Sequence, residues 1–370
     1  MPDTYKVIHI MSEFGGGISS FILNKAEALV NQNVKLDIIT FDTPSERLEN
    51  AINQTGGQIY RVPNPVKESL PQAIKQTNAI FKQLPKDTLV HCNYGMDLGI
   101  IFYLIAKKNG LKFAVHAHSA EPDNINDWRR KVNCWMADYK LSCGLGATAN
   151  VFGPKAKDVV HIPNSINVNN FINQSDTPRD KAEIYGEENK DKFIISQIAR
   201  LHEVKNHKFS LEIIEELSRT DLDFLWVLFG KGKLEEQIKQ AVKDKGLEQY
   251  VKFMGRRDDI STLYPTMDLV VLPSHFEGLS TVAVETQASG KKILLSDNQT
   301  RETDLGLGLA EFLPIVDATL WADTIMANLE PANVSPAMIL EHFEAKKFTN
   351  EASAQLYVDF LAGKVTSYKI

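Results

Sequence analysis

The sequence contains few cysteines and no long apolar run. Its three cysteines, Cys92, Cys134 and Cys143, are widely spaced and form no CxxC pair among the 370 residues, so a disulfide scaffold and a structural zinc site are both disfavoured. No stretch approaches 18 consecutive apolar residues, and the opening residues MPDTYKVIHIMSE lack a basic segment before a helix-long apolar run. We therefore expect a cytoplasmic protein without a membrane-spanning helix.

The chain also lacks a strongly basic part. Residues 1–170 carry 18 Lys and Arg against 15 Asp and Glu, and the remaining residues carry 23 against 32. A nucleic-acid-binding domain is normally much more basic, so we expect no nucleic-acid partner. The small positive excess of the first part still allows contact with an anionic membrane surface. The 43% of hydrophobic and 24% of charged residues are typical of globular proteins and exclude disordered and coiled-coil classes.

The sequence does contain two series of alternating strands and helices. Helical patterns separate apolar, β-rich segments, which lie at 5–10, 34–41, 57–64, 87–93 and 112–119 and again at 193–200, 223–230, 250–255, 268–274 and 291–297. A polar, Asn-rich stretch at 163–192 separates the two series. This alternation predicts an α/β protein made of two doubly wound, Rossmann-like domains facing across a crevice. We place the domains at 1–170 and 171–345 and a terminal helical segment at 346–370.

The segment PSHFEGLSTVAVETQASG, at 273–290, carries the strongest local signal. Glu277 follows an apolar strand directly, Gly278 permits a tight turn, and Ser280 can cap a helix whose first turn offers free N–H groups to an anion. Glu285 lies in the second turn and leans back toward the start of the helix. Its carboxylate can accept hydrogen bonds from two hydroxyl groups, as from a ribose diol. Alternatively, both glutamates belong to a solvated face.

Two cations and a glycine run mark the ends of two other strands. Arg200 and Lys205 follow the first strand of the second series, where a bidentate guanidinium and a point-like ammonium suit a diphosphate. Gly15, Gly16 and Gly17 follow the first strand of the chain, so their N–H groups can approach an anion closely. Solvated cations and a plain strand-to-helix turn are the alternative interpretations.

The segments GGGISS, ARLHEVKN, FGKGKLEE, MGRRDDI and EGLSTVAVE occur in this order, and with them the sequence resembles the GT-B glycosyltransferases of glycosyltransferase family 4, in particular the branch of exopolysaccharide and capsule biosynthesis. The resemblance covers nearly the whole chain. It implies a retaining hexosyltransferase that uses a nucleotide-diphosphate sugar, most often a UDP-sugar, without a bound metal or other cofactor. It also implies a glycan acceptor linked to undecaprenyl diphosphate, and a terminal helix that returns to the N-terminal domain.

The resemblance further implies roles for individual residues. Arg200 and Lys205 would hold the donor diphosphate and neutralise the leaving group, and Glu285 would bind the ribose. Glu277 and His118 would lie beside the donor sugar as catalytic residues. The other donor-binding residues that it implies are Gly16, Gly17, Gly230, Arg257, Gly278, Leu279 and Ser280. We expect His116 to point to the opposite face of its strand from His118.

Fixed cations also bear on the need for a metal. Cleavage of a sugar–phosphate bond leaves negative charge on the diphosphate, which Arg200 and Lys205 would stabilise electrostatically, so we expect no divalent metal to be required. The DxD string Asp221-Leu222-Asp223 precedes a strand and so lies at the wrong end for the site. His275 and Phe276 depart from the family pattern, in which an apolar or aromatic pair is more usual.

A membrane contact is suggested by NINDWRRKVNCWMADYK, at 124–140. Trp128 and Trp135 are seven residues apart on one helical face, beside the cations Arg129, Arg130 and Lys131. This combination is typical of a helix at a lipid interface and predicts peripheral attachment to the inner face of the cell membrane. Alternatively, the tryptophans belong to the core.

Three other functions remain open from the sequence. A UDP-sugar epimerase of the same fold would also need a diphosphate site, and a two-domain sugar-binding protein would show the same paired sheets. A nicotinamide oxidoreductase would need a GxGxxG turn, whereas the glycines at 15–17 have a different spacing.

Overall fold

The computed structural model describes residues 4–11, 17–118, 127–172 and 179–368, and the chain divides into two compact units. Unit 1 consists of Met1–Ile166 together with Lys347–Ile370, and unit 2 consists of Asn167–Lys346. The chain therefore leaves unit 1 after Ile166 and returns to it after Lys346. None of the helices in the described ranges is long and apolar enough to cross a membrane.

Unit 1 is built on a sheet of seven parallel strands in the order β3-β2-β1-β4-β5-β6-β7. The strands are β1 (Tyr5–Met11), β2 (Val34–Thr40), β3 (Ile59–Arg61), β4 (Leu89–Cys92), β5 (Lys112–Ala117), β6 (Tyr139–Ser142) and β7 (Val159–His161). The order reverses between β1 and β4. In an open parallel sheet this reversal leaves a crevice at the carboxyl ends of the two strands.

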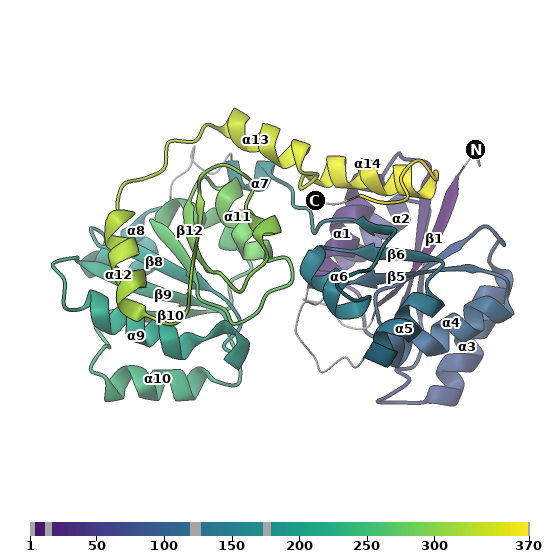
Figure 1. Ribbon diagram of the computed structural model, residues 1–370, viewed down its shortest axis with the longest axis horizontal. Coiled ribbons are helices and arrows are strands. Elements are labelled where there is room, and N and C mark those ends of the chain that lie inside the picture. The colour runs from purple at the N-terminus through teal and green to yellow at the C-terminus, as the bar shows by residue number, and fades with distance from the viewer. Residues whose placement is uncertain (1–3, 12–16, 119–126, 173–178, 369–370) are drawn as a thin grey trace. The chain divides into compact units, whose positions relative to one another are not determined.

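Helices cover both faces of this sheet, as Figure 1 shows. One face carries α1 (Gly17–Leu29), α2 (Glu46–Gln54) and α14 (Asn350–Leu361), and the other carries α3 (Leu70–Gln83), α4 (Met96–Lys108), α5 (Asp127–Met136) and α6 (Leu145–Val151). The yellow α14 lies along the purple α1 in Figure 1. Its buried side chains, among them Tyr357 and Phe360, join the same core as Phe21 of α1. The terminal helix thus returns to the N-terminal domain, as expected.

Unit 2 contains six parallel strands in the order β10-β9-β8-β11-β12-β13, with the reversal between β8 and β11. The strands are β8 (Phe193–Ile198), β9 (Phe224–Phe229), β10 (Val251–Gly255), β11 (Leu269–Leu272), β12 (Lys292–Ser296) and β13 (Ala310–Leu313). One face packs against α9 (His207–Leu217), α10 (Glu235–Asp244) and α12 (Ala318–Ala327), and the other against α7 (Asn169–Ile172), α8 (Lys181–Tyr185), α11 (Thr281–Ala288) and α13 (Pro336–Ala345). The predicted fold class, two doubly wound Rossmann-like domains, is confirmed.

Some elements differ from the sequence expectation. The strands β6, β7 and β13 were not predicted, because a short apolar run does not by itself reveal its conformation; β3, β4 and β11 are as short but lie within the longer β-rich segments 57–64, 87–93 and 268–274. The terminal helical segment expected at 346–370 contains α14, and a second helix, α13, ends just before it; between the two helices Lys347 takes a φ of 63°. A left-handed residue cannot continue a right-handed helix, so the stretch forms two helices.

Candidate active site

Two cations follow the central strand of unit 2. β8 ends at Ile198, and Arg200 and a 3-10 turn at Glu203–Lys205 lead into α9. The Gln197 amide donates a hydrogen bond of 3.1 Å to the carbonyl of Lys205, and the His207 ring lies 3.1 Å from the carbonyl of Arg200. These bonds fix the backbone that carries both cations, at the strand end where the sheet order reverses.

Lys205 forms an ion pair with Glu277, which lies in the loop after β11. Only 18% of the Lys205 side chain and 14% of the Glu277 side chain are exposed. The Ser274 hydroxyl donates a second hydrogen bond, of 2.9 Å, to the same carboxylate oxygen. The His275 N–H also donates to the Val204 carbonyl at 2.8 Å, so the two loops are joined by backbone as well as by side chains.

A pocket of about 260 Å³ opens beside these loops. It is lined by Ile198, Ala199, Arg200, Lys205, Phe229, Gly230, Arg256, Arg257, Ile260 and Val282. The fold therefore brings four of the predicted site residues to one place: Arg200, Lys205, Gly230 and Arg257. Ligand pockets for drug-sized molecules usually measure about 300–1,000 Å³, so this one has room for part of a nucleotide sugar.

Gly230 allows three strand ends to approach one another. A Cβ atom at this position would lie 1.9 Å from the Ala199 carbonyl oxygen, and the residue has a φ of 143°. Its N–H donates a 2.8 Å hydrogen bond to the carbonyl of Gly255 at the end of β10. A larger residue would push the turn that bears Arg200 away from β9, so glycine is required here by sterics as well as by conformation.

Two of the three arginines that line the pocket, Arg257 and Arg200, differ in their bonding. Arg257 binds Asp259 through two hydrogen bonds, of 2.7 and 2.6 Å, and Arg179 approaches the same carboxylate at 3.0 Å. The bond from Arg257 lowers the pKa of Asp259 to about 2. The exposed guanidinium of Arg200, in contrast, has no ion pair or side-chain hydrogen bond within the described ranges. Arg200 therefore retains its hydrogen-bonding capacity for an anion.

Helix α11 presents the second glutamate. Ser280 caps the helix by accepting a hydrogen bond of 3.3 Å from the Ala283 N–H, after Gly278 and the buried Leu279. Glu285 lies in the second turn, where the Tyr264 hydroxyl donates a 3.3 Å hydrogen bond to its carboxylate. Burial raises the pKa of Glu285 to about 7. Sequence reasoning missed Tyr264, because only the fold brings it to a helix that begins 17 residues later.

His118 follows β5 in unit 1 and is half-buried. Its Nε2 lies 2.9 Å from the amide oxygen of Asn93, and the Asn93 amide nitrogen donates a 3.0 Å hydrogen bond to the Ile10 carbonyl. The latter bond sets the orientation of the amide, so Nε2 of His118 carries the proton and Nδ1 is an acceptor. Burial lowers the pKa of His118 to about 3, so the ring acts as a neutral hydrogen-bonding group.

The prediction that His116 points away from His118 was wrong. The two ring centroids lie 4.0 Å apart, because residues two positions apart in an extended chain share a face. His91 Nε2 lies 2.9 Å from His116 Nδ1, His91 Nδ1 lies 2.7 Å from the Tyr357 hydroxyl, and His9 stacks on His91 at 4.0 Å. The sequence held a signal for this cluster, a histidine near the carboxyl end of each of three neighbouring strands.

The glycines after β1 and the aspartates of the DxD string are the remaining residues considered in the sequence. Gly15 and Gly16 lie outside the described residues, and Gly17 is the first residue of α1. Asp221 and Asp223 precede β9, at the amino edge of the sheet. Within the described ranges there is no group of three His, Cys, Asp or Glu side chains that could hold a metal ion. The need for a metal stays untested.

Comparisons with known proteins agree with this arrangement. Residues 15–151 match the family model "Glycosyltransferase Family 4", and residues 179–303 match "Glycosyl transferases group 1". A Bacillus subtilis protein named as glycosyltransferase EpsF is 28% identical over 334 residues, 86% of each chain. The Escherichia coli UDP-Gal:alpha-D-GlcNAc-diphosphoundecaprenol alpha-1,3-galactosyltransferase is 23% identical over 319 residues, 79% of each chain.

Solved structures share the fold. Alr3699/HepE of Anabaena, crystallised in complex with UDP-glucose, has a TM-score of 0.77 with 15% identity, over 97% of this chain and 99% of the other. A glycosyltransferase from Rickettsia africae also has a TM-score of 0.77 and 15% identity, over 98% and 99%. The protein thus belongs to the glycosyltransferases with the GT-B fold, which confirms the resemblance found in the sequence.

Proposed function

We propose that this protein is a retaining hexosyltransferase that moves a sugar from a UDP-sugar to a lipid-linked glycan during assembly of a bacterial exopolysaccharide or capsule. The observation that carries the proposal is the meeting of Arg200, Lys205 and Gly230 at one pocket of unit 2, with Lys205 bonded to Glu277. The names of the relatives support the finer terms: UDP-Gal and a diphosphoundecaprenol acceptor for the Escherichia coli protein, and EpsF for the Bacillus subtilis protein.

The cations of the pocket would hold the donor diphosphate. Arg200 can donate two parallel hydrogen bonds to phosphate oxygens, and Lys205 adds a compact positive charge. As the sugar–phosphate bond breaks, negative charge grows on the departing UDP, and fixed cations beside it lower the barrier. These two side chains would supply the positive charge that a divalent metal supplies elsewhere, so we expect activity to persist in EDTA.

The carboxylates would bind the two ends of the donor. Glu285 would accept hydrogen bonds from the ribose hydroxyl groups, while Gly278, Leu279 and Ser280 would offer N–H groups at the start of α11. When the diphosphate engages Lys205, Glu277 gives up part of its ion pair and becomes available to hydroxyl groups of the sugar. Gly16 and Gly17 would close over the phosphates.

His118 would act in the transfer step. Its neutral ring, oriented by Asn93, would lie beside the donor sugar without placing a positive charge near the developing oxocarbenium ion. The retaining outcome follows the family resemblance. We expect His118→Ala and Glu277→Ala to reduce mainly turnover, and unchanged turnover in both variants would remove the two residues from the active site.

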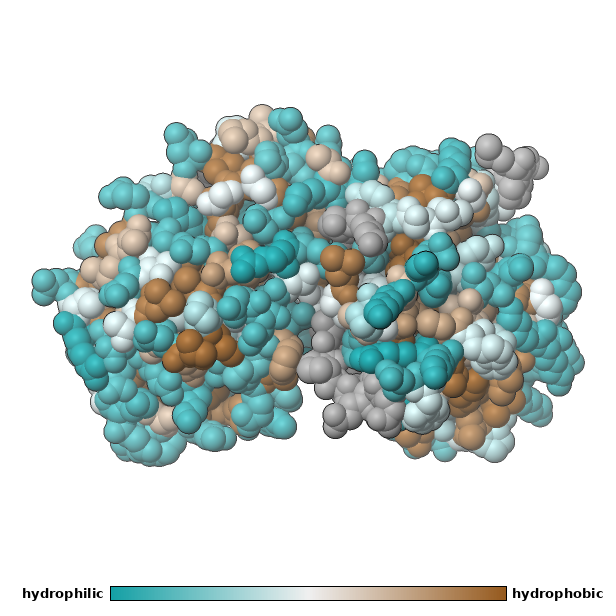
Figure 2. All heavy atoms as spheres, in the orientation of Figure 1, coloured by the Kyte–Doolittle hydropathy of each residue, from teal (hydrophilic) through white to brown (hydrophobic). Residues whose placement is uncertain are grey.

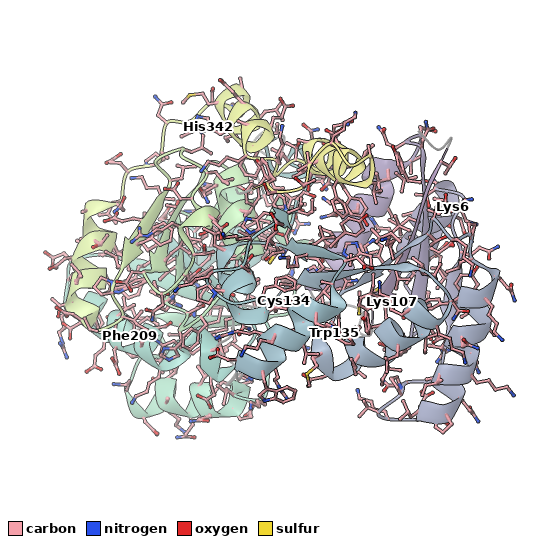
Figure 3. The ribbon with its side chains drawn as sticks, turned by 45° about the vertical axis from the view of Figure 1, so that its right-hand side comes forward. Lys6, Lys107, Cys134, Trp135, Phe209 and His342 are labelled. Atoms are coloured by element: carbon pink, nitrogen blue, oxygen red, sulfur yellow. The ribbon has the colours of Figure 1, made fainter. Side chains whose placement is uncertain are left out.

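An enzyme with a lipid-linked acceptor needs a surface that contacts the membrane. We assign this surface to α4 and α5 of unit 1. Trp128 and Trp135 are 52% and 64% exposed, so they do not belong to the core, and Leu104 of α4 is 58% exposed. Trp135 packs at 4.8 Å on Tyr103, over which the ammonium of Lys107 lies. Figure 2 shows apolar side chains gathered over this part of the surface, and Figure 3 labels Trp135 and Lys107 on their neighbouring helices.

The cations beside the tryptophans are only partly available. Arg129 pairs with Asp97 and Arg130 with Asp127, both at 3.2 Å, whereas Lys131 is exposed on the same helix. We expect the protein to co-sediment with vesicles containing phosphatidylglycerol at low salt, and a double W128A, W135A variant to bind several-fold less. Replacement of the exposed Val316 of unit 2 by Ala is the control. No binding at low salt would overturn this assignment.

The test of the donor site is a calorimetric titration with UDP, GDP, ADP and NAD. Selective binding of UDP that the double R200A, K205A variant loses would support the proposal. A double K208A, R219A variant removes two exposed cations from unit 2 and should bind UDP normally. If no nucleotide binds, or if the R200A, K205A variant binds as the parent does, the assignment of the pocket fails.

A UDP-sugar panel then tests the reaction. Release of UDP together with a longer glycan indicates transfer, and an anomeric analysis of the product distinguishes retention from inversion. Formation of an epimer without release of UDP would indicate an epimerase instead.

A further inference from the structure

A larger pocket, of about 750 Å³, lies in unit 1 at the opposite edge of the sheet from His118. It is formed by the amino ends of β1, β4, β5, β6 and β7, and the end of α14 with the segment after it forms one of its walls. Its volume falls within the range of pockets that bind drug-sized ligands. Parallel sheets carry catalytic groups at their carboxyl edge, so the predicted active-site residues do not account for this pocket.

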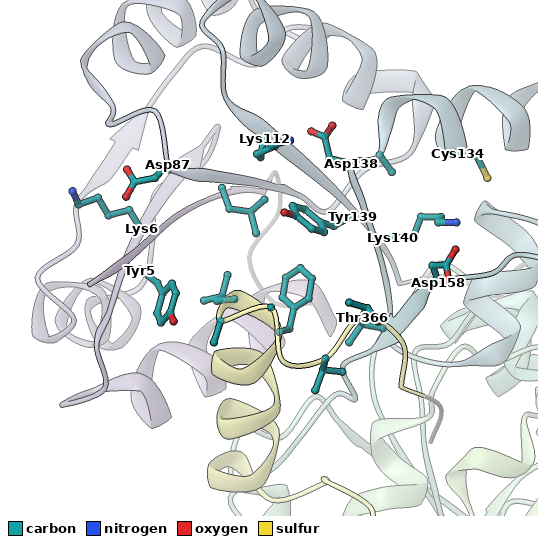
Figure 4. A pocket seen from close by; sticks show the side chains of 18 residues that line it. Tyr5, Lys6, Asp87, Lys112, Cys134, Asp138, Tyr139, Lys140, Asp158 and Thr366 are labelled. Atoms are coloured by element: carbon teal, nitrogen blue, oxygen red, sulfur yellow. The ribbon is translucent and has the colours of Figure 1, made fainter. Parts of the chain in front are cut away.

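The floor of the pocket is apolar and contains an exposed aromatic ring. Tyr139 is 42% exposed, and its ring meets Phe360 edge to face, with centroids 5.4 Å apart and an angle of 89°. Leu89, Val160 and Val365 complete the apolar part. Figure 4 shows Tyr139 in the middle of the group, with Tyr5 and Lys6 on one side and Lys140 and Asp158 on the other.

The rim carries three lysines and three aspartates, which are Lys6, Lys112, Lys140, Asp87, Asp138 and Asp158. Asp138 bonds Lys107 and the Phe113 N–H, and Lys140 bonds the Lys157 carbonyl. Within the described residues, the other four charged groups have no ion pair or side-chain hydrogen bond. Two donors, Lys6 and Lys112, and two acceptors, Asp87 and Asp158, are therefore available around an aromatic floor.

The equal numbers of lysines and aspartates around the pocket determine the charge of the ligand that it can bind. An anion would be repelled by the aspartates and a cation by the lysines, while a purely apolar chain would strip water from charged groups without replacing their hydrogen bonds. A neutral sugar has hydroxyl groups that both donate and accept, and C–H faces that pack on an aromatic ring whose face is electron-rich. We propose that this pocket is a second glycan site, which holds a neutral oligosaccharide segment apart from the nucleotide site.

The identity of the ligand rests on the proposed function, because an enzyme that assembles a polysaccharide binds a long glycan as its acceptor or product. A site of this kind would keep the glycan chain bound to the enzyme between successive transfer reactions. We expect glycan binding there to be independent of UDP, since the pocket lies at the amino edge of the unit 1 sheet, whereas Arg200, Lys205 and Glu285 lie in unit 2 and His118 follows the carboxyl end of β5.

The experiment measures binding of neutral tetrasaccharides of glucose, galactose and N-acetylglucosamine to the full chain by calorimetry, with and without saturating UDP. We expect saturable binding of at least one of them, unchanged by UDP. Tyr139→Ala should weaken it about tenfold, because it removes the aromatic platform, whereas Tyr139→Phe should retain it. Tyr60→Ala, which removes another partly exposed tyrosine of unit 1, is the matched control.

Melting temperatures and UDP titrations of the same variants separate a local effect from misfolding. Tyr139→Ala should bind UDP as the parent does. The inference is overturned if no tetrasaccharide binds up to 10 mM, if Tyr139→Ala and Asp87→Asn both bind normally, or if only an oligouronate or dodecyl phosphate binds. Tetrasaccharide binding without any UDP binding would instead count against the proposed function and leave the glycan site standing.

Discussion

Lys205 and Glu277, 72 residues apart in the chain, neutralise each other at the carboxyl edge of the unit 2 sheet. The pair is shielded from most of the solvent, and each charge is neutralised by the other. On the proposed function, a diphosphate would compete with Glu277 for the Lys205 ammonium. Donor binding and release of the glutamate would then be coupled through one lysine.

Lys205→Ala should weaken the binding of UDP-glucose about 10- to 100-fold, because a charge-assisted hydrogen bond contributes about 1.5–3 kcal/mol. The loss should be partly recovered in a double K205A, E277Q variant, since the unpaired carboxylate no longer repels the diphosphate. Calorimetry measures both variants, with the exposed Lys208→Ala as control. Equal affinities in the parent and Lys205→Ala would contradict a role in diphosphate binding.

The raised pKa of Glu285 predicts a pH dependence. Only the carboxylate accepts hydrogen bonds from both ribose hydroxyls, so binding of UDP-glucose should strengthen as pH rises through 7 and weaken by about fivefold from pH 7 to pH 6. UDP-glucose is chosen because its esterified diphosphate does not titrate there. Calorimetry between pH 5.5 and 8.5 measures the profile, and Glu285→Gln should give weak, flat binding. A sloping profile in Glu285→Gln would assign the effect to another group.

Tyr264 is predicted to position Glu285. Its hydroxyl donates to the carboxylate and lowers the pKa of Glu285 relative to burial alone. Tyr264→Phe removes that bond, so the midpoint of the pH profile should move upward and UDP-glucose binding at pH 7 should weaken by about 2- to 10-fold, as expected for one hydrogen bond. An unchanged midpoint, even with weaker binding, would indicate that the tyrosine has a packing role only.

Gly230→Ala should be much more destabilising than an ordinary glycine substitution. The new Cβ would meet the Ala199 carbonyl at 1.9 Å, whereas at Gly246, which also has a positive φ, no atom lies within 4 Å. We expect Gly246→Ala to cost about 1 kcal/mol in the free energy of unfolding and Gly230→Ala about 3 kcal/mol or more. Urea denaturation compares them. Similar losses would mean that the turn before Arg200 adapts easily.

The buried histidines predict sensitivity to acid. Burial lowers the pKa of His9 and His118 to about 3 and those of His91 and His116 well below the ordinary value of 6.5. Below pH 6.5 the histidines of the unfolded chain bind protons, whereas the buried histidines of the folded state do not. The free energy of unfolding should therefore decrease as pH falls, by about 1.4 kcal/mol per pH unit for each histidine. Glu285 alone has the opposite effect. Because its pKa is raised in the folded state, its contribution to the free energy of unfolding decreases as pH rises from 4.5 to 7.

Two measurements check the histidine cluster. Urea unfolding from pH 7.5 to 5.5 should give decreasing stability below pH 6.5, and NMR signals of the four imidazole rings should not titrate over this range. Titration of any of these rings near pH 6 would show that water reaches the cluster and would remove the predicted slope for that residue.

The sequence could reveal those parts of the site that depend on local signals. Arg200, Lys205 and Glu277 each follow an apolar strand, and the carboxyl ends of parallel strands meet at one edge, so their proximity could be expected before the structure was available. Ser280 and Glu285 could be placed by the capping signal and by helix geometry. Whether these residues bind a donor stays a prediction.

Other contacts depend on packing between distant segments. Tyr264 lies in the segment ISTLYPTM, whose sequence predicts a short helix, but only the tertiary fold places its hydroxyl at Glu285. The wall of the larger pocket comes from Phe360 to Thr366, about 200 residues or more after the strands that it faces. Sequence periodicity within a window of a dozen residues contains no information about such pairings.

The return of α14 to unit 1 determines the order in which the two units can finish folding during synthesis. When the ribosome has made the first 346 residues, all of unit 2 is present, whereas unit 1 still lacks α14. Until then the Lys25 ammonium has the Ser165 hydroxyl but lacks the Ser353 hydroxyl, and His91 has His116 but lacks the Tyr357 hydroxyl, so polar groups that end up buried lack part of their hydrogen bonds. Unit 2 can therefore complete its fold first, and the N-terminal part of unit 1 must wait, exposed to chaperones and proteases, until residues 347–370 are made.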